Sequence, residues 1–295
     1  MKIHHARPVR DIVSSGASGL GISAHTKLTA VFGTPLKHSM SPTIHNAIYR
    51  TLGKDAVLLA FESKNIADIM SAMRALPIHM GAFTIPLKQV VMPYLDSISE
   101  EARAIGSVNT VINDGDRLLG YNTDIVGIAA SLPTKDIKGK KVLIVGAGGV
   151  AQPIAYHLQK SAAKIFCNNR ESAMAETLCA RWGGTVIDRE HLGDVKFDVV
   201  INATPLGSSP YEDKMAVPEE MLRKGMTIFD VIYAPPETKL TKVARAKGCK
   251  VVTGVKMFVA QAIEQERLWL KRDIPDEGYT ELVEKTLARM HPRTH

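Results

Sequence analysis

The chain has 295 residues, of which 45% are hydrophobic and 23% charged, a composition typical of a globular protein with room for two domains. The formal charge is +7, but Lys and Arg are spread along the chain, which argues against a nucleic-acid partner and suits a small anionic ligand. The three cysteines, Cys167, Cys179 and Cys249, are odd in number and far apart, so neither a disulfide framework nor a metal site is expected.

Cysteines without a pairing pattern favour a reducing compartment, so we expect a cytoplasmic protein. No apolar run reaches the roughly 18 residues of a membrane span, so no membrane partner is expected. The first 25 residues are mixed and Gly/Ser-rich, without the apolar segment of a signal peptide. We interpret residues 1–25 as a loosely held extension.

Short apolar runs alternate with helical patterns in the first half of the chain. Strands are predicted over 28–33, 56–61, 81–85, 107–112 and 118–122. Helices are predicted to begin at Ser41-Pro42, with Ser41 as the cap, to span 65–76 and to begin again at Pro86. This alternation predicts an α/β fold with a mainly parallel sheet.

A polar stretch at 131–141 contains turn residues and marks a boundary, after which a second alternating series begins. Its strands are predicted over 142–146, 164–168, 198–203, 227–232 and 250–254, with helices between them. The last stretch, 255–291, has the pattern of two helices. The chain is therefore predicted to contain two α/β domains.

A glycine-rich loop follows the strand at 142–146. It reads Gly146-Ala147-Gly148-Gly149-Val150-Ala151 and leads into a helical pattern. The glycines allow a tight turn and a close backbone approach, and the helix N-terminus offers free N–H groups to a pyrophosphate. The alternative is a turn without a ligand, but the strand before it and the helix after it favour dinucleotide binding.

The next strand ends at Asn168-Asn169-Arg170, where NAD-binding loops usually place an acidic residue for the ribose hydroxyls. A carboxylate would repel a 2′-phosphate, whereas the guanidinium of Arg170 could pair with it. The position therefore favours NADP, with NAD possible if Arg170 is only a solvated side chain at a helix start.

Polar residues gather after the strands of the first half, where α/β folds place their active sites. They are Ser39, Ser41, Thr84, Lys88, Asn109, Asn122, Thr123 and Asp124. Each has an ordinary structural explanation by itself, such as a helix cap for Asp124 or a solvated surface position for Lys88. Together they suit a polyhydroxylated ring, and a Lys–Asp pair could carry a proton.

The motifs, taken in order, resemble the shikimate dehydrogenase family. The matching pieces lie between Gly33 and Gln261 and begin with Gly33-x-Pro35-x-x-His38-Ser39-x-Ser41-Pro42-x-x-His45-Asn46. They continue with Thr84-Ile85-Pro86-Leu87-Lys88, Gly106-Ser107-Val108-Asn109-Thr110, Gly120-x-Asn122-Thr123-Asp124, the glycine-rich loop, Asn169-Arg170, Asn202-Ala203-Thr204, Asp230-x-x-Tyr233-x-Pro235 and Gly254-x-x-Met257-x-Val259-x-Gln261.

The resemblance implies reversible, NADPH-dependent reduction of 3-dehydroshikimate to shikimate by a substrate-binding catalytic domain (26–130 plus 255–295) and a Rossmann-like dinucleotide-binding domain (131–254). It implies Lys88 and Asp124 as the catalytic pair. The implied substrate-binding residues are Ser39 and Ser41 for the carboxylate, Thr84, Asn109 and Gln261 for the ring, and Tyr233 lining the cleft. The implied cofactor-binding residues are Gly146, Ala147, Gly148, Gly149, Val150, Asn169, Arg170, Thr204, Gly254 and Met257.

Four positions depart from the family pattern and leave two questions open. Ala82 replaces a usual Asn, so a quinate or quinate/shikimate dehydrogenase is the alternative to a shikimate enzyme. Glu171, Met174 and Gln152 replace a Thr and two basic residues around the 2′-phosphate, which bears on NADP against NAD. A non-catalytic ligand-sensing relative is a further alternative, disfavoured by the presence of both Lys88 and Asp124. The protein is expected to act as a monomer or homodimer.

Overall fold

The structure is a computed structural model that describes residues 22–37, 39–115, 117–275 and 278–290, so the expected extension at 1–25 lies largely outside the described residues. The chain divides into two compact units. Unit 1 contains the described residues up to Thr123 together with Val259–Thr286, and unit 2 contains Asp124–Phe258 and the end of the chain from Leu287.

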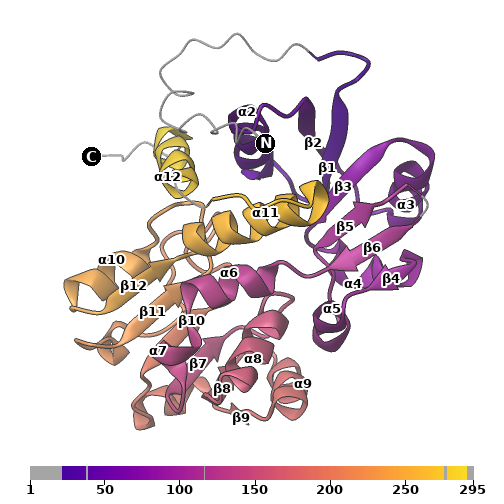
Figure 1. The fold of residues 1–295 in the computed structure, drawn as a ribbon. Helices are drawn as coiled ribbons and strands as arrows, with labels where there is room; N and C mark the ends of the chain where they lie inside the picture. Colours follow the sequence, from indigo (N-terminus) through magenta and orange to yellow (C-terminus); the bar gives the residue numbers. More distant parts are fainter. Residues whose placement is uncertain (1–21, 38, 116, 276–277, 291–295) are drawn as a thin grey trace. The chain divides into compact units, whose positions relative to one another are not determined.

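Unit 1 is built on a six-stranded sheet of mixed direction, with strand order β2-β1-β3-β5-β6-β4 (Figure 1). Its strands are β1 (Lys27–Gly33), β2 (Ala56–Glu62), β3 (Ile78–Phe83), β4 (Ser97–Ile98), β5 (Thr110–Asn113) and β6 (Leu118–Tyr121). Its helices are α2 (Ser41–Thr51), α3 (Ile66–Ala75), α4 (Leu87–Val90), η1 (Met92–Tyr94) and α5 (Glu100–Ile105). β5 runs antiparallel to both β3 and β6, whereas the other pairs are parallel.

Two expectations for unit 1 need correction. Ser41 is the first residue of α2 rather than its cap, because the chain already turns into helical geometry at Met40, and no side chain caps the helix. β3 begins at Ile78 and ends at Phe83, earlier than the predicted 81–85. The reason is that β3 pairs with β1 from Leu28 onward, and this pairing draws residues before Gly81 into the sheet.

Unit 2 is a doubly wound sheet of six parallel strands in the order β12-β11-β10-β7-β8-β9. The strands are β7 (Lys141–Val145), β8 (Lys164–Asn168), β9 (Thr185–Val186), β10 (Val199–Asn202), β11 (Thr227–Asp230) and β12 (Lys250–Thr253). The helices are α6 (Asp124–Ser131), α7 (Thr134–Ile137), α8 (Ala151–Lys160), α9 (Ser172–Trp182), η2 (Arg189–Asp194), η3 (Glu219–Met221) and α10 (Lys239–Ala246). The order reverses between β7 and β10, the point at which such sheets bind ligands.

The α/β fold class is thereby confirmed. The strands of unit 2 lie close to the predicted ones, and their burial explains this agreement. Parallel strands are covered on both faces and read as continuous apolar runs, as in Val142–Val145, which is buried throughout. Figure 1 shows α8 and α9 beside β7–β9, and α10 beside β11 and β12, in agreement with their contacts.

Two helices stand where the chain passes from one unit to the other: α6 and the helix that begins at Gly254. α6 belongs to unit 2 because it packs against α8, and a Cβ at Gly127 would lie 2.4 Å from the Met257 oxygen. Unit 2 therefore begins at Asp124, before the polar stretch at 131–141. The C-terminal helices are α11 (Gly254–Leu270) and α12 (Tyr279–Met290), and α11 contributes residues to both units.

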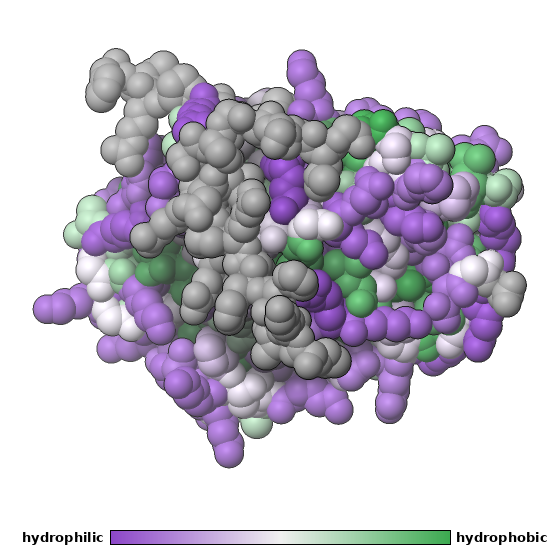
Figure 2. Space-filling model, turned by 45° about the horizontal axis from the view of Figure 1, so that its top comes forward, coloured by the Kyte–Doolittle hydropathy of each residue, from purple (hydrophilic) through white to green (hydrophobic). Residues whose placement is uncertain are grey.

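No helix within the described residues is long and apolar enough to cross a membrane. Figure 2 shows hydrophilic residues spread over the visible face with smaller hydrophobic areas between them. Cys167 and Cys179 are buried, and burial raises the pKa of the Cys167 thiol to about 12.

Candidate active site

A buried group of amides and hydroxyls surrounds Asn109; we name Asn109, Thr110, Thr123 and Gln265 the amide cluster. The Asn109 Oδ1 accepts hydrogen bonds from Thr110 Oγ1 and from the Thr123 amide, both at 2.8 Å. Gln265 Nε2 donates to Thr110 Oγ1 at 2.9 Å. These donors fix the orientation of the Asn109 side chain, because its oxygen is engaged from the protein side.

Gln261, one turn before Gln265 on α11, joins the same group. Thr123 Oγ1 donates to Gln261 Oε1 at 3.4 Å, and Asn109 Nδ2 donates to Thr123 Oγ1 at 3.1 Å. Two of the predicted ring-binding residues, Asn109 and Gln261, therefore lie on either side of one threonine. Asp124 follows this threonine directly in the chain, is 6% exposed and opens α6.

Thr84 and Lys88 are brought toward Asn109 by backbone hydrogen bonds within unit 1. The Phe83 amide, just before Thr84, donates to the Asn109 carbonyl at 2.7 Å, and the Val108 amide donates to the Lys88 carbonyl at 2.8 Å. A Cβ at Gly33 would lie 2.4 Å from Thr84 Cγ2, so only glycine permits this approach of β1. The backbone segments that carry Thr84 and Lys88 therefore lie beside the segment that carries Asn109.

Ser39 and Ser41 lie together at the start of α2. The Ser41 amide donates to Ser39 Oγ at 3.3 Å, and the Ser39 amide donates to the Leu36 carbonyl at 2.9 Å. The two hydroxyls stand at the positive end of an eleven-residue helix, a favourable place for an anionic group. α2 has no acidic residue in its first turn.

In unit 2, the loop Gly146–Val150, which we name the glycine loop, has the form that a dinucleotide needs. Gly146 has φ +105°, and a Cβ there would lie 2.8 Å from the Ala203 oxygen. A Cβ at Gly148 or Gly149 would meet no atom within 4 Å, so the backbone of these residues is open to a close approach. α8 follows without an acidic residue in its first turn, and the loop therefore fits a pyrophosphate.

The residues expected near a 2′-phosphate divide into two kinds. Asn169 is engaged within the protein, since its Oδ1 accepts from the Ala147 amide at 3.2 Å and its Nδ2 donates to the Glu171 carbonyl at 2.9 Å. Arg170 is exposed, and its guanidinium lies 3.6 Å from the Glu171 carboxylate. Gln152 accepts a hydrogen bond from Trp182 Nε1 at 3.0 Å and is therefore also committed within the protein.

A second buried polar group centres on Asp230, to which the sequence reasoning assigned no role. Its carboxylate accepts from Thr238 Oγ1 at 2.6 Å, Asn202 Nδ2 at 3.0 Å and the Ile232 amide at 3.2 Å. Burial raises the pKa of Asp230 to about 6, against the lowering effect of these donors. The available signal was a carboxylate at the end of the apolar strand Thr227–Asp230.

The Asp230 group holds the loops that carry further predicted residues. Asn202 Oδ1 accepts from Thr204 Oγ1 at 2.6 Å, which fixes the loop after β10. Tyr233 stacks on Phe258 with ring centroids 4.6 Å apart, one residue after the buried Met257. A Cβ at Gly254 would lie 2.2 Å from the Val231 oxygen, so packing alone already requires glycine at this position.

Ala82 lies in an apolar environment. It is 6% exposed and belongs to a hydrophobic cluster with Val31, Tyr49, Leu58 and Met80. The neighbourhood described for this side chain is therefore apolar, and an amide placed there would lose hydration.

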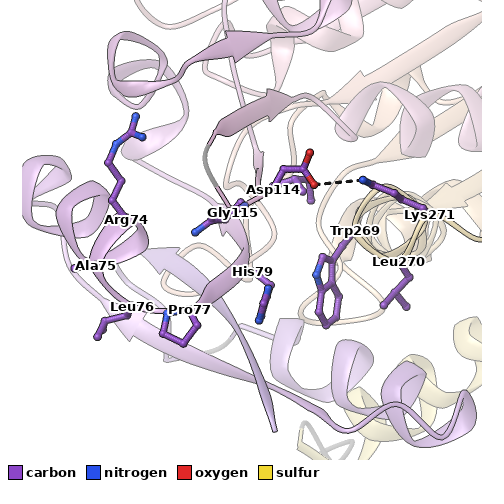
Figure 3. A pocket seen from close by; sticks show the side chains of 12 residues that line it. Arg74, Ala75, Leu76, Pro77, His79, Asp114, Gly115, Trp269, Leu270 and Lys271 are labelled. Atoms are coloured by element: carbon purple, nitrogen blue, oxygen red, sulfur yellow. Dashed lines mark hydrogen bonds and ion pairs between the residues drawn. The ribbon is translucent and has the colours of Figure 1, made fainter. Parts of the chain in front are cut away.

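No group of three or more His, Cys, Asp or Glu side chains that could hold a metal occurs within the described ranges. A cavity of about 620 Å³ is lined by residues of α3, β3, the β5–β6 turn and the end of α11, including His79, Trp269 and the Asp114–Lys271 ion pair (Figure 3). None of the predicted site residues lines this cavity.

Two family models match the chain, one within each unit. Residues 31–111 match the family model of the shikimate dehydrogenase substrate binding domain, and residues 128–252 match the model described as shikimate / quinate 5-dehydrogenase. The shikimate dehydrogenase (NADP(+)) of Thermococcus kodakarensis is 40% identical over 262 residues, which cover 86% of this chain and 94% of the relative.

Solved structures give the same result. A shikimate dehydrogenase in complex with NADP+ has a TM-score of 0.83 at 32% identity, covering 92% of this chain and 99% of that one. Shikimate 5-dehydrogenase from Listeria monocytogenes, in complex with shikimate and NAD, has a TM-score of 0.81 at 32% identity, covering 89% and 98%. The resemblance read from the motifs is thereby confirmed, and the chain belongs to the shikimate dehydrogenase family.

Proposed function

We propose that the protein is an NADP-dependent shikimate dehydrogenase that interconverts shikimate and 3-dehydroshikimate. The observation that carries the proposal is the amide cluster, which fixes Asn109 next to Gln261 in the unit that matches the substrate-binding domain model. Several fixed amides and hydroxyls are what recognition of a polyhydroxylated ring requires. Unit 1 would accordingly be the substrate-binding unit and unit 2 the dinucleotide-binding unit.

Each predicted residue has a part in this proposal. Ser39 and Ser41 would donate to the ring carboxylate at the N-terminus of α2. Thr84, Asn109 and Gln261 would hydrogen-bond the ring hydroxyls, and Tyr233 would line the substrate side of the pocket. The residues that would hold the cofactor are the glycine loop, Asn169, Arg170, Thr204, Gly254 and Met257.

Lys88 and Asp124 would act as the acid–base pair at the reacting carbinol oxygen. Bound NADP would supply hydride chemistry at the reacting carbon, and in the oxidation of shikimate the Lys88–Asp124 pair would take up the hydroxyl proton. In the reverse direction the pair returns this proton as the carbonyl becomes a hydroxyl. Such a positioned group typically contributes about 10²–10⁴ in rate.

Further parts of the proposal concern the setting. We place the protein in the cytoplasm, which is supported by three cysteines that remain free thiols. We expect a monomer or a homodimer with a small anionic ring acid as ligand and no nucleic-acid or membrane partner.

The test is a set of initial rates with shikimate and quinate, each with NADP and NAD. We expect the largest kcat/KM for shikimate with NADP and at most minor activity with quinate. A larger kcat/KM for quinate would assign the protein to quinate oxidation. Equal kcat/KM for NADP and NAD would contradict the cofactor preference, and no turnover with any pair would contradict the enzyme assignment.

A further inference from the structure

The helix that carries Ser41 is joined to the helix that carries Gln261 by a buried pair of ionisable side chains. His45 Nδ1 and Glu266 Oε1 are 2.5 Å apart, and neither side chain has exposed surface. Tyr49 donates its phenol to the same oxygen at 2.7 Å, and Thr29 Oγ1 lies 2.8 Å from the phenol oxygen. Two residues of α2 therefore meet one carboxylate of α11, and Thr29 of β1 contacts the Tyr49 phenol.

The spacing of residues along α2 relates the His45–Glu266 pair to Ser41. Ser41, His45 and Tyr49 recur every four residues and therefore lie along one face of the helix. All three are buried. Because His45 is one turn from Ser41, a hydrogen bond that fixes His45 also fixes the first turn of α2, where both serine hydroxyls stand.

The same holds on α11, where Gln261, Gln265 and Glu266 follow one another within two turns. Gln261 and Gln265 join the amide cluster, as described above. Glu266 faces α2 through His45 and Tyr49. α11 thus contacts the amide cluster through Gln261 and Gln265 and contacts α2 through Glu266.

Stability alone does not explain why this position has ionisable residues. Glu266 Oε2 and His45 Nε2 are buried without a hydrogen-bond partner among the described residues, which is a cost to folding. A buried ion pair is often no more stabilising than apolar side chains of similar size. A hydrogen bond restricts both the distance and the angle between its partners. Apolar packing does not orient two side chains in this way.

We propose that His45 and Glu266 are positioning residues that hold the hydroxyls of Ser39 and Ser41, at the start of α2, in register with Gln261 of α11, and so set recognition of the substrate carboxylate. The proposal rests on the function above, in which Ser39 and Ser41 bind that carboxylate. Neither His45 nor Glu266 touches the substrate in this account. Their effect reaches it through the placement of α2.

The test compares an acid and an uncharged substrate. KM and kcat are measured with NADP for shikimate and for its carboxamide, in the unaltered protein and in Glu266→Gln. The glutamine keeps an acceptor oxygen but removes the charge, so the hold on His45 weakens. Loss of one well-placed charge-assisted contact should raise the shikimate KM about tenfold, with kcat changed by less than about threefold.

The carboxamide separates positioning from general damage. The carboxamide KM should change by less than about twofold in Glu266→Gln. Comparing the effect of the mutation on the two substrates isolates the coupling between position 266 and the substrate carboxylate. Should Glu266→Gln not fold, Tyr49→Phe gives the same comparison, since it removes one donor to Glu266 and keeps the aromatic ring. The control His157→Leu removes a buried histidine hydrogen bond of unit 2, from Nε2 to the Leu132 oxygen, and should change neither substrate KM.

The outcomes separate this inference from the proposed function. Equal changes for the acid and the amide, or an unchanged shikimate KM in both Glu266→Gln and Tyr49→Phe, would contradict the positioning role while leaving the enzyme assignment standing. An unaltered protein that oxidises neither substrate contradicts the proposed function, and the role of the pair falls with it.

Discussion

The amide cluster of unit 1 and the glycine loop of unit 2 differ in how they prepare for a ligand. Asn109, Thr110, Thr123 and Gln265 are all nearly fully buried and hydrogen-bonded to one another, so their geometry is set before substrate binds. In the glycine loop, Gly148 and Gly149 have open space where a side chain would be. Arg170, beyond the loop, is 93% exposed.

This difference predicts different sensitivities on the two sides. A preorganised hydrogen-bond network discriminates between ligands by position, so small shifts in it should be costly. An open backbone and an exposed cation attract phosphate mainly by charge. Small displacements of these groups should therefore affect binding less. Mutations of the amide cluster should therefore affect the ring acid alone, and those near the loop should affect the cofactor alone.

The largest effect is expected at the proposed catalytic pair, where a mutation should lower kcat and leave binding of the ring acid nearly unchanged. Lys88→Ala should lower kcat by about two to four orders of magnitude with little change in the shikimate KM, as expected for a lost acid–base group. Asp124→Asn should behave alike, and the double variant should be far from additive because the two act as one unit. Steady-state kinetics test this, and near-normal turnover of either single variant would contradict the assignment.

Asp230 gives a prediction for stability in unit 2. Its pKa is raised to about 6 in the folded protein, so the folded state binds the proton more tightly than the unfolded chain does. The stabilisation from protonation is therefore full below the unfolded pKa and is lost as the pH rises through about 6. At about 1.4 kcal/mol per pKa unit, the loss between pH 4 and pH 7 should be about 2–3 kcal/mol.

Urea unfolding of the unaltered protein and of Asp230→Asn at several pH values checks this. The asparagine does not titrate, so the stability of the unaltered protein relative to the variant should fall between pH 4 and pH 7. Other titrating groups contribute equally to both proteins and cancel. A difference that stays constant with pH would show that Asp230 does not titrate in this range.

Replacing Arg170 should weaken binding of NADP and leave binding of the ring acid unchanged. Loss of a charge-assisted contact to phosphate costs about 1.5–3 kcal/mol, so Arg170→Ala should raise the NADP KM about 10- to 150-fold. The KM values for NAD and shikimate should not change. Initial-rate kinetics with both cofactors measure this, and an NADP KM within experimental error of the unaltered value would place the 2′-phosphate elsewhere.

Gln265 tests the amide cluster itself. Gln265→Leu leaves Thr110 Oγ1, which donates to Asn109, without its own buried donor, and this loss of about 1–2 kcal/mol should raise the shikimate KM about 5- to 30-fold. The NADP KM should stay constant. The matched exchange Gln152→Leu, in unit 2, should leave the shikimate KM unchanged, and equal effects of the two exchanges would contradict the division between the sides.

Glu171 should have the smallest effect. Its carboxylate lies 3.6 Å from the Arg170 guanidinium and would compete with a phosphate for it. Exposed ion pairs are worth about 0–1 kcal/mol, so Glu171→Gln should lower the NADP KM by at most about fivefold. The NAD KM measured beside it serves as the control, and a rise in the NADP KM would mean that Glu171 assists the cofactor.

The sequence predicted the parts of the fold that depend on local pattern. Strands buried on both faces appear as continuous apolar runs, so β7 and β8 were placed within a residue of their observed ends. The two-residue strands β4 and β9 were not predicted, because so short a stretch has no periodicity to read. The antiparallel pairing of β5 with β3 depends on sheet topology, which a parallel αβ pattern does not contain.

The site divides in the same way. The roles of residues in recognisable motifs, such as Thr84 and Asn109, come from the resemblance and stay predictions. The His45–Glu266 pair joins residues 221 apart in the chain, and no local pattern connects them. Asp230 lies within a motif, but the side-chain donors around it come from two other segments, so no local pattern singles out its carboxylate.

The glycines of unit 2 have a consequence for which substitutions the protein tolerates. At Gly146 and Gly254 a methyl group would lie within 2.8 Å of backbone oxygens, so a library selected only for folded protein should lose every variant at these positions. At Gly148 and Gly149 the same methyl group meets nothing, and folded variants should survive. Only selection for growth that depends on turnover would then remove them, so that two screens on one library would separate glycines required by the architecture from glycines required by the ligand.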